Sequence, residues 1–180
     1  MYGVVSRRNA AHVLGIVAVL VVAADHASGV DPKERPALRS QPDAARGRLW
    51  TMTRDGVDLY DVKTGWKLAQ IALPGWIWVG ERYACPPALA IGPRGEAVIT
   101  SNVVPTLWRV DAVTLVVSQH DLVLDEDKGR DIGFTGLVYS ARQRTYYAVS
   151  AMHGSLWRID PLLKTAQRVP LPAPLPKTCG

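Results

Sequence analysis

Two histidines in the body of the chain, His120 and His153, are suited to proton transfer, because imidazole titrates near neutral pH. His153 stands in the short connection Met152-His153-Gly154, directly before a strand-like stretch. It is therefore the best single candidate for a general base, and the alternative is a structural role in a turn. His120 lies inside an expected strand, where a half-buried, hydrogen-bonded role is more ordinary. Zinc takes three or four protein ligands, so these two histidines do not by themselves make a zinc site.

An acidic segment, Leu124-Asp125-Glu126-Asp127-Lys128-Gly129-Arg130-Asp131, could bind a cation. Carboxylate oxygens are the ligands that calcium prefers, so Asp125, Asp127 and Asp131 are candidate ligands. The spacing does not match the calcium loop of an EF-hand, and no glutamate stands at its closing position. A solvated acidic loop is the alternative, and no cofactor other than calcium is considered.

A second segment, residues 74–83, is rich in aromatic residues. Aromatic faces beside charged groups could form a binding wall for a flat or sugar-like ligand. The alternative is that the tryptophans pack between structural units. The candidate binding residues, including the histidine above, are Trp76, Trp78, Glu81, Arg82, Tyr83 and His153.

Several enzyme and nucleic-acid-binding classes find no support in the sequence. It has no Gly-x-Ser-x-Gly elbow, no phosphate loop and no Cys-x-x-Cys, which argues against a covalent serine nucleophile, a nucleotide site and a c-type haem. Its net charge of +5 comes from scattered basic residues and forms no basic face with stacking aromatics, so nucleic acid is not an expected partner.

The candidate residues lie between repeats of about fifty residues. Leu107-Trp108-Arg109-Val110-Asp111 recurs as Leu156-Trp157-Arg158-Ile159-Asp160, and Asp58-Leu59-Tyr60-Asp61 fits the same slot. A threonine follows each final aspartate, and such an aspartate can accept backbone N–H groups in a turn. Apolar stretches of period two surround these motifs, so each repeat is expected to form four short strands. The repeats span residues 36–85, 86–132 and 133–172, and a proline-rich tail follows at 173–180.

This pattern of apolar strand, glycine turn, apolar strand, loop, Leu-Trp-Arg-Val-Asp-x-x-Thr and final strand resembles the blades of YVTN-type and quinoprotein-like β-propellers. The resemblance implies an all-β fold with blades of four antiparallel strands. It implies little about activity, because the family includes dehydrogenases, lactonases, lyases and binding scaffolds. We expect a binding or scaffold module. The alternative is a propeller enzyme of the lactonase or lyase type, or one related to quinoprotein dehydrogenases, using loop residues around His153 and the acidic segment 125–131.

Three repeats make an incomplete or half propeller, because closed propellers have about four to eight blades. Pairing of two copies would give a homodimer with a six-bladed ring. An open or distorted fragment and a remnant of a longer gene are the alternatives.

The first residues have the pattern of an export signal. Arg7 and Arg8 precede an uncharged apolar run, residues 13–24, and small residues follow. We expect cleavage after Ala27, with residues 28–35 as a linker and a periplasmic or secreted product; an uncleaved N-terminal membrane anchor is the alternative. In such an oxidising compartment, Cys85 and Cys179 are expected to form a disulfide, against the alternative of two free or intermolecular thiols.

Overall fold

The computed structural model describes residues 37–76, 78–80 and 85–176. The predicted leader (1–27) and linker (28–35), together with Glu81, Arg82, Tyr83 and Cys179, lie outside the described residues. The described part of the chain contains no helix long and apolar enough to cross a membrane.

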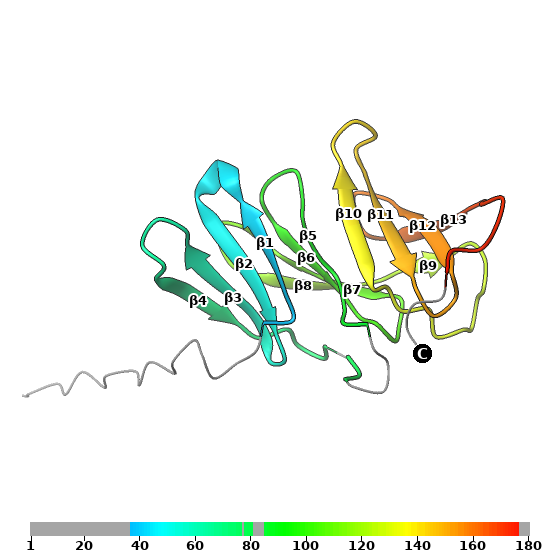
Figure 1. The fold of residues 1–180 in the computed structure, drawn as a ribbon, viewed down its shortest axis with the longest axis horizontal. Helices are drawn as coiled ribbons and strands as arrows, with labels where there is room; N and C mark the ends of the chain where they lie inside the picture. The colour runs from blue at the N-terminus through cyan, green and yellow to red at the C-terminus, as the bar shows by residue number, and fades with distance from the viewer. Residues whose placement is uncertain (1–36, 77, 81–84, 177–180) are drawn as a thin grey trace, which may run out of the picture. The chain divides into compact units, whose positions relative to one another are not determined.

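Three sheets, each built on four consecutive antiparallel strands, follow one another along the chain (Figure 1), which confirms the expected all-β repeat fold. The first sheet comprises β1 (Arg39–Asp43), β2 (Arg48–Thr53), β3 (Gly56–Asp61) and β4 (Lys67–Ile71). The second comprises β5 (Leu89–Ile91), β6 (Ala97–Thr100), β7 (Thr106–Val110) and β8 (Val117–Asp121). The third comprises β10 (Gly136–Ser140), β11 (Thr145–Ser150), β12 (Ser155–Ile159) and β13 (Thr165–Val169). A short 3-10 turn, Ala44–Arg46, joins β1 to β2.

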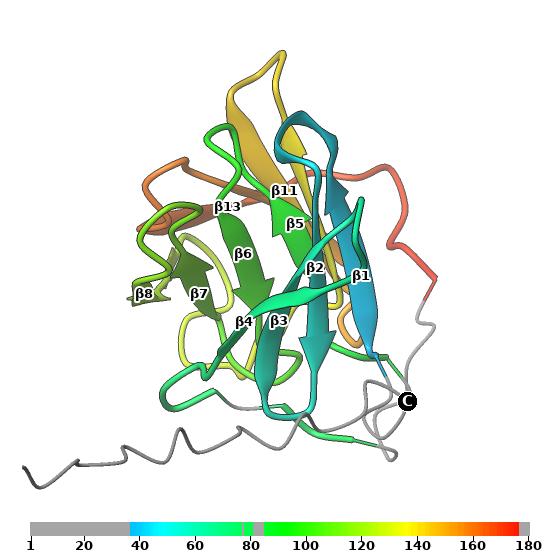
Figure 2. The ribbon, with the colours of Figure 1, turned by 90° about the vertical axis from the view of Figure 1, so that its left-hand side faces the viewer.

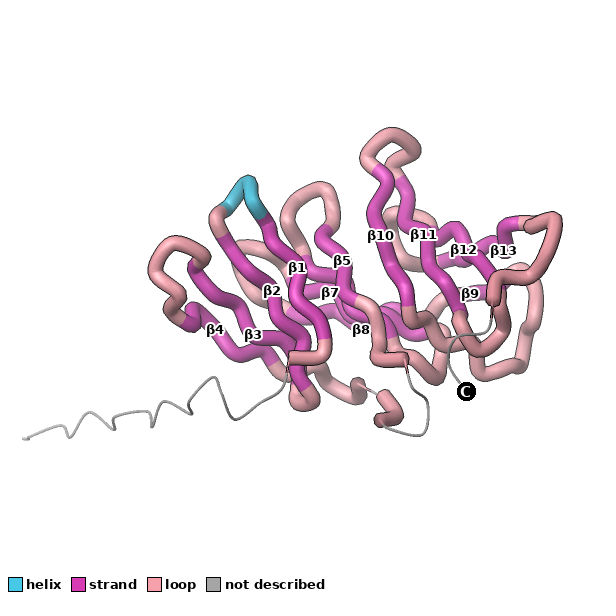
Figure 3. Tube along the Cα trace, viewed as in Figure 1, coloured by secondary structure: helices cyan, strands magenta, loops and turns pink. Residues whose placement is uncertain are grey.

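An additional two-residue strand, β9 (Val123–Leu124), was not expected from the sequence. The chain leaves the second sheet after β8, and β9 then pairs in parallel with β13, the last strand of the third sheet. Val123 lies opposite Thr165, and Leu124 lies opposite Ala166. The third sheet therefore has five strands, in the order β10-β11-β12-β13-β9. Figure 2 shows the sheets after a quarter turn, and Figure 3 separates the strands from the loops that join them.

The repeated aspartates form the turns between the third and fourth strands of each sheet. Asp61 Oδ1 accepts the backbone N–H of Thr64 at 2.7 Å and its hydroxyl at 2.8 Å. Asp111 accepts the same two groups of Thr114 at 2.8 and 3.0 Å. These hydrogen bonds, the backbone one foremost, hold the pKa of Asp61 and of Asp111 below the usual value of aspartate. The local spacing of Asp and Thr thus encodes the turn directly.

The core lies between the sheets, in two apolar clusters. One joins the first and second sheets around Trp50 and Trp108, and the other joins the second and third around Phe134 and Trp157. Trp108 is 1% exposed and Trp157 is fully buried, so the two equivalent positions of the repeat have the same environment. The indole N–H of each motif tryptophan donates a hydrogen bond. Trp108 donates to Pro74 O at 2.8 Å, and Trp157 donates to Ser155 Oγ at 2.9 Å. Burial of these rings fixes how neighbouring sheets stack.

Candidate functional site

The candidate residues gather at one end of the strands, which we call the loop end. It is formed by the β2–β3 turn (residues 54–55), the described parts of the link from β4 to β5 (72–76, 78–80 and 85–88), the β6–β7 loop (101–105), the link from β9 to β10 (125–135) and the β11–β12 turn (151–154). In Figure 1 these connections lie along the lower edge, whereas the β1–β2, β5–β6 and β10–β11 turns lie along the upper edge. The loop end therefore carries the candidate residues that the structure describes, namely Trp76, Trp78, Asp125, Asp127, Asp131 and His153.

A stacked pair of tryptophans with an arginine is the most distinctive feature of the loop end. The ring centroids of Trp76 and Trp78 are 6.3 Å apart, with an angle of 25° between the planes. Cζ of Arg54, from the β2–β3 turn, lies 5.8 Å from the centroid of the Trp78 ring, within the range of a cation–π contact. Trp78 is half-buried and Arg54 is exposed, so a positive charge lies beside a partly accessible aromatic ring.

The alternative role of packing between structural units applies to Trp76. The indole Nε1 of Trp76 donates to the backbone oxygen of Thr100 at 3.1 Å, and the ring packs against the core between the first two sheets. Trp76 therefore has a structural role, and the half-buried Trp78 stacks on it. The other expected members of this wall, Glu81, Arg82 and Tyr83, lie outside the described residues.

Asn102, which the sequence analysis did not single out, fixes the backbone of the aromatic segment. Only 4% of Asn102 is exposed. Its side chain accepts the N–H of Val79 at 3.0 Å and donates to Val79 O at 2.9 Å and to Cys85 O at 3.2 Å. A buried amide whose hydrogen bonds are satisfied holds its partners in one arrangement. The only sequence signal is a polar Thr-Ser-Asn run after the apolar strand 97–99.

Arg39 ties the three sheets together. From the start of β1 its Nε donates to Pro87 O at 2.8 Å, and its Nη2 donates to Thr135 O at 2.9 Å. Pro87 precedes the second sheet and Thr135 precedes the third, so one guanidinium spans the entries of all three sheets. Thr100 adds a parallel tie, because its hydroxyl accepts the N–H of Ala88 and donates to Phe134 O.

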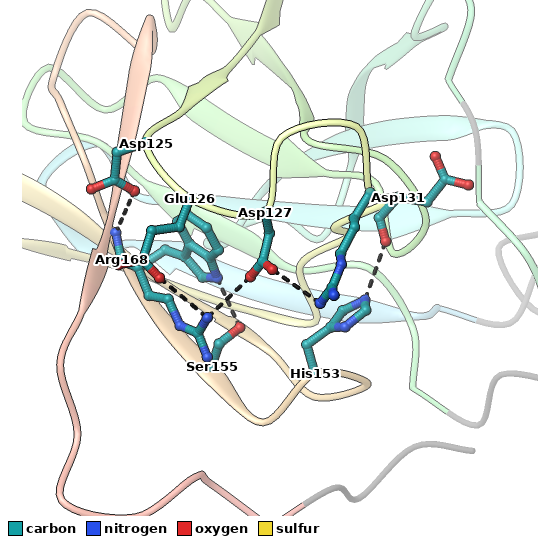
Figure 4. Close-up of polar contacts among 9 residues, drawn as sticks. Asp125, Glu126, Asp127, Asp131, His153, Ser155 and Arg168 are labelled. Carbon is teal, nitrogen blue, oxygen red and sulfur yellow. Dashed lines mark hydrogen bonds and ion pairs between the residues drawn. The ribbon is translucent and has the colours of Figure 1, made fainter.

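The acidic side chains of segment 125–131 contact two arginines, Arg168 and Arg130 (Figure 4). Asp125 Oδ1 accepts the backbone N–H of Arg168 in β13 at 3.0 Å. The guanidinium of Arg168 pairs with Glu126 at 3.3 Å and with Asp127 at 3.1 Å, and Arg130 pairs with Asp127 at 3.0 Å. Among the described residues no three or more His, Cys, Asp or Glu side chains form a group that could hold a metal ion. These contacts make the segment a clasp that fastens β9 to β13.

His153 is half-buried and its Nε2 lies 3.3 Å from the backbone oxygen of Asp131 (Figure 4). His153 therefore contacts the backbone of the acidic segment and not one of its carboxylate side chains. Asp131 is exposed. Gly154, next to His153, accepts the N–H of Leu175 at 2.9 Å, so the proline-rich tail returns to the same turn.

His120 and Arg109 meet at the seam between the second and third sheets. Nη2 of Arg109 lies 3.2 Å from Nε2 of His120 and donates to Leu162 O of the third sheet at 3.3 Å. Ser118 Oγ is 2.9 Å from the same imidazole nitrogen. Burial, and then the nearby Arg109 charge, lower the pKa of His120 against the opposing effect of Asp160 and Asp121.

Cys85 is half-buried and disulfide-bonded. Its predicted partner, Cys179, lies outside the described residues, so the pairing of these two cysteines stays a prediction.

Comparison with known proteins places the fold. No protein-family model matches the sequence, and no curated protein matches it. Virginiamycin B lyase from Staphylococcus aureus matches with a TM-score of 0.55 at 13% identity, over 78% of this chain and 42% of the lyase. Hydrazine synthase from Kuenenia stuttgartiensis matches with a TM-score of 0.50 at 16% identity, over 68% of this chain and 32% of that chain. Both have propeller folds. The chain has a β-propeller-type fold.

A protein of unknown function from Bacteroides caccae is similar to this propeller-type chain as well, with a TM-score of 0.51 at 17% identity, over 79% of this chain and 48% of that one. The chain spans less than half the length of these three structures. The three sheets correspond to propeller blades, and their first strands neighbour one another in the order β1, β5, β10. Arg39 therefore ties the blades where their innermost strands begin.

Proposed function

We propose that the chain is an exported, propeller-type binding module that holds a ring-containing anionic ligand at its loop end. The observation that carries this proposal is the row formed by Trp76, Trp78 and Arg54. Ring faces stack on aromatic side chains, and a guanidinium pairs well with a carboxylate. The row provides both features. Its two stacked rings have centroids 6.3 Å apart, and the guanidinium carbon lies 5.8 Å from the centroid of the Trp78 ring.

The row is held in place before any ligand arrives. Asn102 fixes the backbone at Val79, and the hydrogen bond to Thr100 fixes the Trp76 ring. A binding surface that is already ordered loses little conformational freedom on binding, which favours affinity. The contacts of Asp125, Asp127 and His153 with Arg168, Arg130 and the backbone support a structural use of the remaining candidate residues.

A matched pair of oligosaccharides tests the ligand class. Calorimetric titration would compare an oligogalacturonate with its methyl-esterified, uncharged form, and a flat aromatic carboxylate would serve as a third probe. We expect an acidic probe to bind more tightly than the neutral one. Arg54→Gln should remove that difference, because the charge is lost, and Trp78→Ala should weaken all binding by roughly tenfold or more.

Trp66→Ala is the matched control, because Trp66 is 76% exposed and lies in the β3–β4 turn, away from the loop end. It should bind like the unchanged chain. The proposal fails if none of the three probes binds, or if Trp78→Ala binds as well as Trp66→Ala.

A propeller enzyme is the second candidate, because one structural neighbour is a lyase and His153 lies at the loop end. Under that alternative, the acidic segment would act with His153 and could take calcium. Calcium that binds only the folded chain would raise its melting temperature in a concentration-dependent way. We expect no such rise, because Glu126 and Asp127 are already paired with Arg168 and Arg130. A rise that Asp127→Asn abolishes would favour the enzyme.

The export part of the proposal rests on the apolar run at 13–24. Residues 1–35 fused to a reporter that is active only outside the cytoplasm should direct activity there. A change of Leu14, Ile16 and Leu20 to Asp should abolish it, because charged residues are costly in a membrane-inserting segment. Equal activity of the two fusions would refute export by this segment.

A further inference from the structure

The end of the sheets opposite the loop end, which we call the turn end, carries exposed charges of a single sign. The four main strands of each sheet are antiparallel, so the turns after the first and the third strand lie at the same end. The turn end is formed by residues 44–47, 62–66, 92–96, 111–116, 141–144 and 160–164. The exposed charged residues in these turns are all basic, namely Arg46, Lys63, Arg94, Arg142, Arg144 and Lys164.

The carboxylates at the turn end are directed into the protein. Asp43 is 5% exposed and Glu96 is 4% exposed. The aspartates of the repeat accept hydrogen bonds from their own turns, as Asp160 does from the backbone N–H groups of Leu162 and Lys164, both at 2.8 Å. The exposed charges of the loop end, by contrast, have both signs. Among the described residues, no carboxylate lies within ion-pair distance of Lys63, Arg142, Arg144 or Lys164.

The same end also exposes large apolar side chains. Nine such side chains are exposed in the described part of the chain, and six of them lie in, or within two residues of, the turns after the third strands. Trp66 is 76% exposed, Val113 83% and Leu162 60%, one from each sheet. Single exposed apolar residues are ordinary, but a recurrence at the same turn of three sheets, among cations, is typical of an interaction surface. The other three are Val62, Leu68 and Val116.

We propose that the turn end binds the surface of an anionic phospholipid bilayer. Such a surface offers anionic headgroups to the lysines and arginines and an apolar layer to the exposed side chains. Tryptophan favours this interface, which suits the exposed ring of Trp66. A polyanion in water would pair with the cations but would leave the apolar side chains in solvent. A chain bound in this way keeps its loop end in solvent, because the two ends are opposite.

Flotation of the full chain with lipid vesicles tests the proposal. We expect binding to an equal mixture of phosphatidylglycerol and phosphatidylcholine, weaker binding as salt is added, and little binding to phosphatidylcholine alone. Lys63→Glu and Arg144→Glu should each lower the affinity for the mixed vesicles by roughly fivefold or more, because each reverses a charge at the membrane. Lys128→Glu, at an exposed lysine of the loop end, should bind like the unchanged chain. The apolar run at 13–24 is present in every variant, so the differences report on the turn end.

Fluorescence with lipids brominated in their acyl chains shows whether apolar side chains enter the bilayer. Bromine quenches tryptophan on contact, so the mixed vesicles should quench the unchanged chain. Trp66→Phe should lose most of that quenching while it still binds. Val113→Ser should weaken binding, whereas Val123→Ser, at an equally accessible valine of β9, should not.

Circular dichroism melting confirms that each variant is folded, as expected for exposed side chains outside both cores. The proposal is overturned if the chain does not bind the mixed vesicles, or if Lys63→Glu and Lys128→Glu bind them equally well. Unchanged quenching in Trp66→Phe overturns it as well. Heparin that binds as tightly as the vesicles, without quenching by brominated lipid, would assign the surface to a polyanion and not to a membrane.

Discussion

The Nη2 of Arg39, at the start of the first sheet, donates to the backbone oxygen of Thr135, at the entry to the third, over 2.9 Å. The same guanidinium reaches Pro87 O. Arg39 and Thr135 are 96 positions apart in the sequence, so this contact links the start of the first sheet directly to the entry of the third.

Loss of the Arg39 guanidinium should destabilise the fold as a whole. Arg39→Ala leaves the two carbonyls without their charged donor, and we expect the free energy of unfolding to fall by about 2 kcal/mol. Arg39→Lys should cost less, because an ammonium can retain one of the two contacts. Urea denaturation measures both, with Arg142→Ala, an exposed arginine of the β10–β11 turn, as control. Equal stability of Arg39→Ala and Arg142→Ala would contradict the role of the tie.

Trp108 and Trp157 should contribute alike, because they occupy equivalent slots and are both buried. Replacement of either by Ala removes a large ring from a closed core and should cost about 3–5 kcal/mol. Thermal or urea unfolding measures the loss. Trp66→Ala, at an exposed turn, should change stability by less than about 0.5 kcal/mol. A loss below about 1 kcal/mol at both buried positions would be inconsistent with the packing between sheets.

Gly133 cannot accept a side chain. A Cβ there would lie 1.9 Å from the carbonyl carbon of Asn102, and backbone atoms cannot yield as a flexible side chain can. Gly133→Ala should therefore cost about 3 kcal/mol or more. Gly129→Ala is the control: it has open space but a φ of +82°, so only backbone strain of about 1–2 kcal/mol is expected. If the two variants unfold at the same denaturant concentration, this close approach is not a constraint.

The seam between the second and third sheets should weaken in mild acid through His120. Burial and Arg109 lower its pKa below the ordinary value of 6.5, although Asp160 and Asp121 oppose them. As the pH falls through about 6.5, the unfolded chain takes up the proton first, so stability declines from there down to the folded pKa. His120→Gln should remove this component of the pH dependence while retaining a hydrogen-bonding side chain. Identical profiles of the unfolding free energy from pH 8 to 5 would refute the assignment.

Local patterns explain which parts of the fold were predictable. The Leu-Trp-Arg strands and the Asp-x-x-Thr turns are encoded within a few residues, so the strands of the second and third repeats follow from the sequence. The strand β9 was missed because two residues, Val123 and Leu124, give no pattern until Ala166 lies beside them. Arg39 was missed for a similar reason: nothing near it in the sequence shows that its acceptors are Pro87 and Thr135.

The same contrast holds for the candidate site. The aromatic segment and the acidic segment stand out by composition, and both lie at the loop end. Their roles depend on partners from other repeats, namely Thr100 and Asn102 for the first and Arg168 for the second. Because such pairings are set by tertiary packing, the sequence identifies the two segments but not the residues that they contact.

The path of β9 has a consequence for how such a chain can be lengthened or shortened in evolution. The segment after the second sheet visits the far edge of the third at β13 before it enters that sheet at β10. The heritable module is therefore offset from the visible sheet, since Val123 and Leu124 belong to the sheet that follows them. A gene duplication or deletion with its breakpoint between Leu124 and Gly136 would detach that edge strand together with the clasp on Arg168. A breakpoint before Leu122 would transfer the module complete.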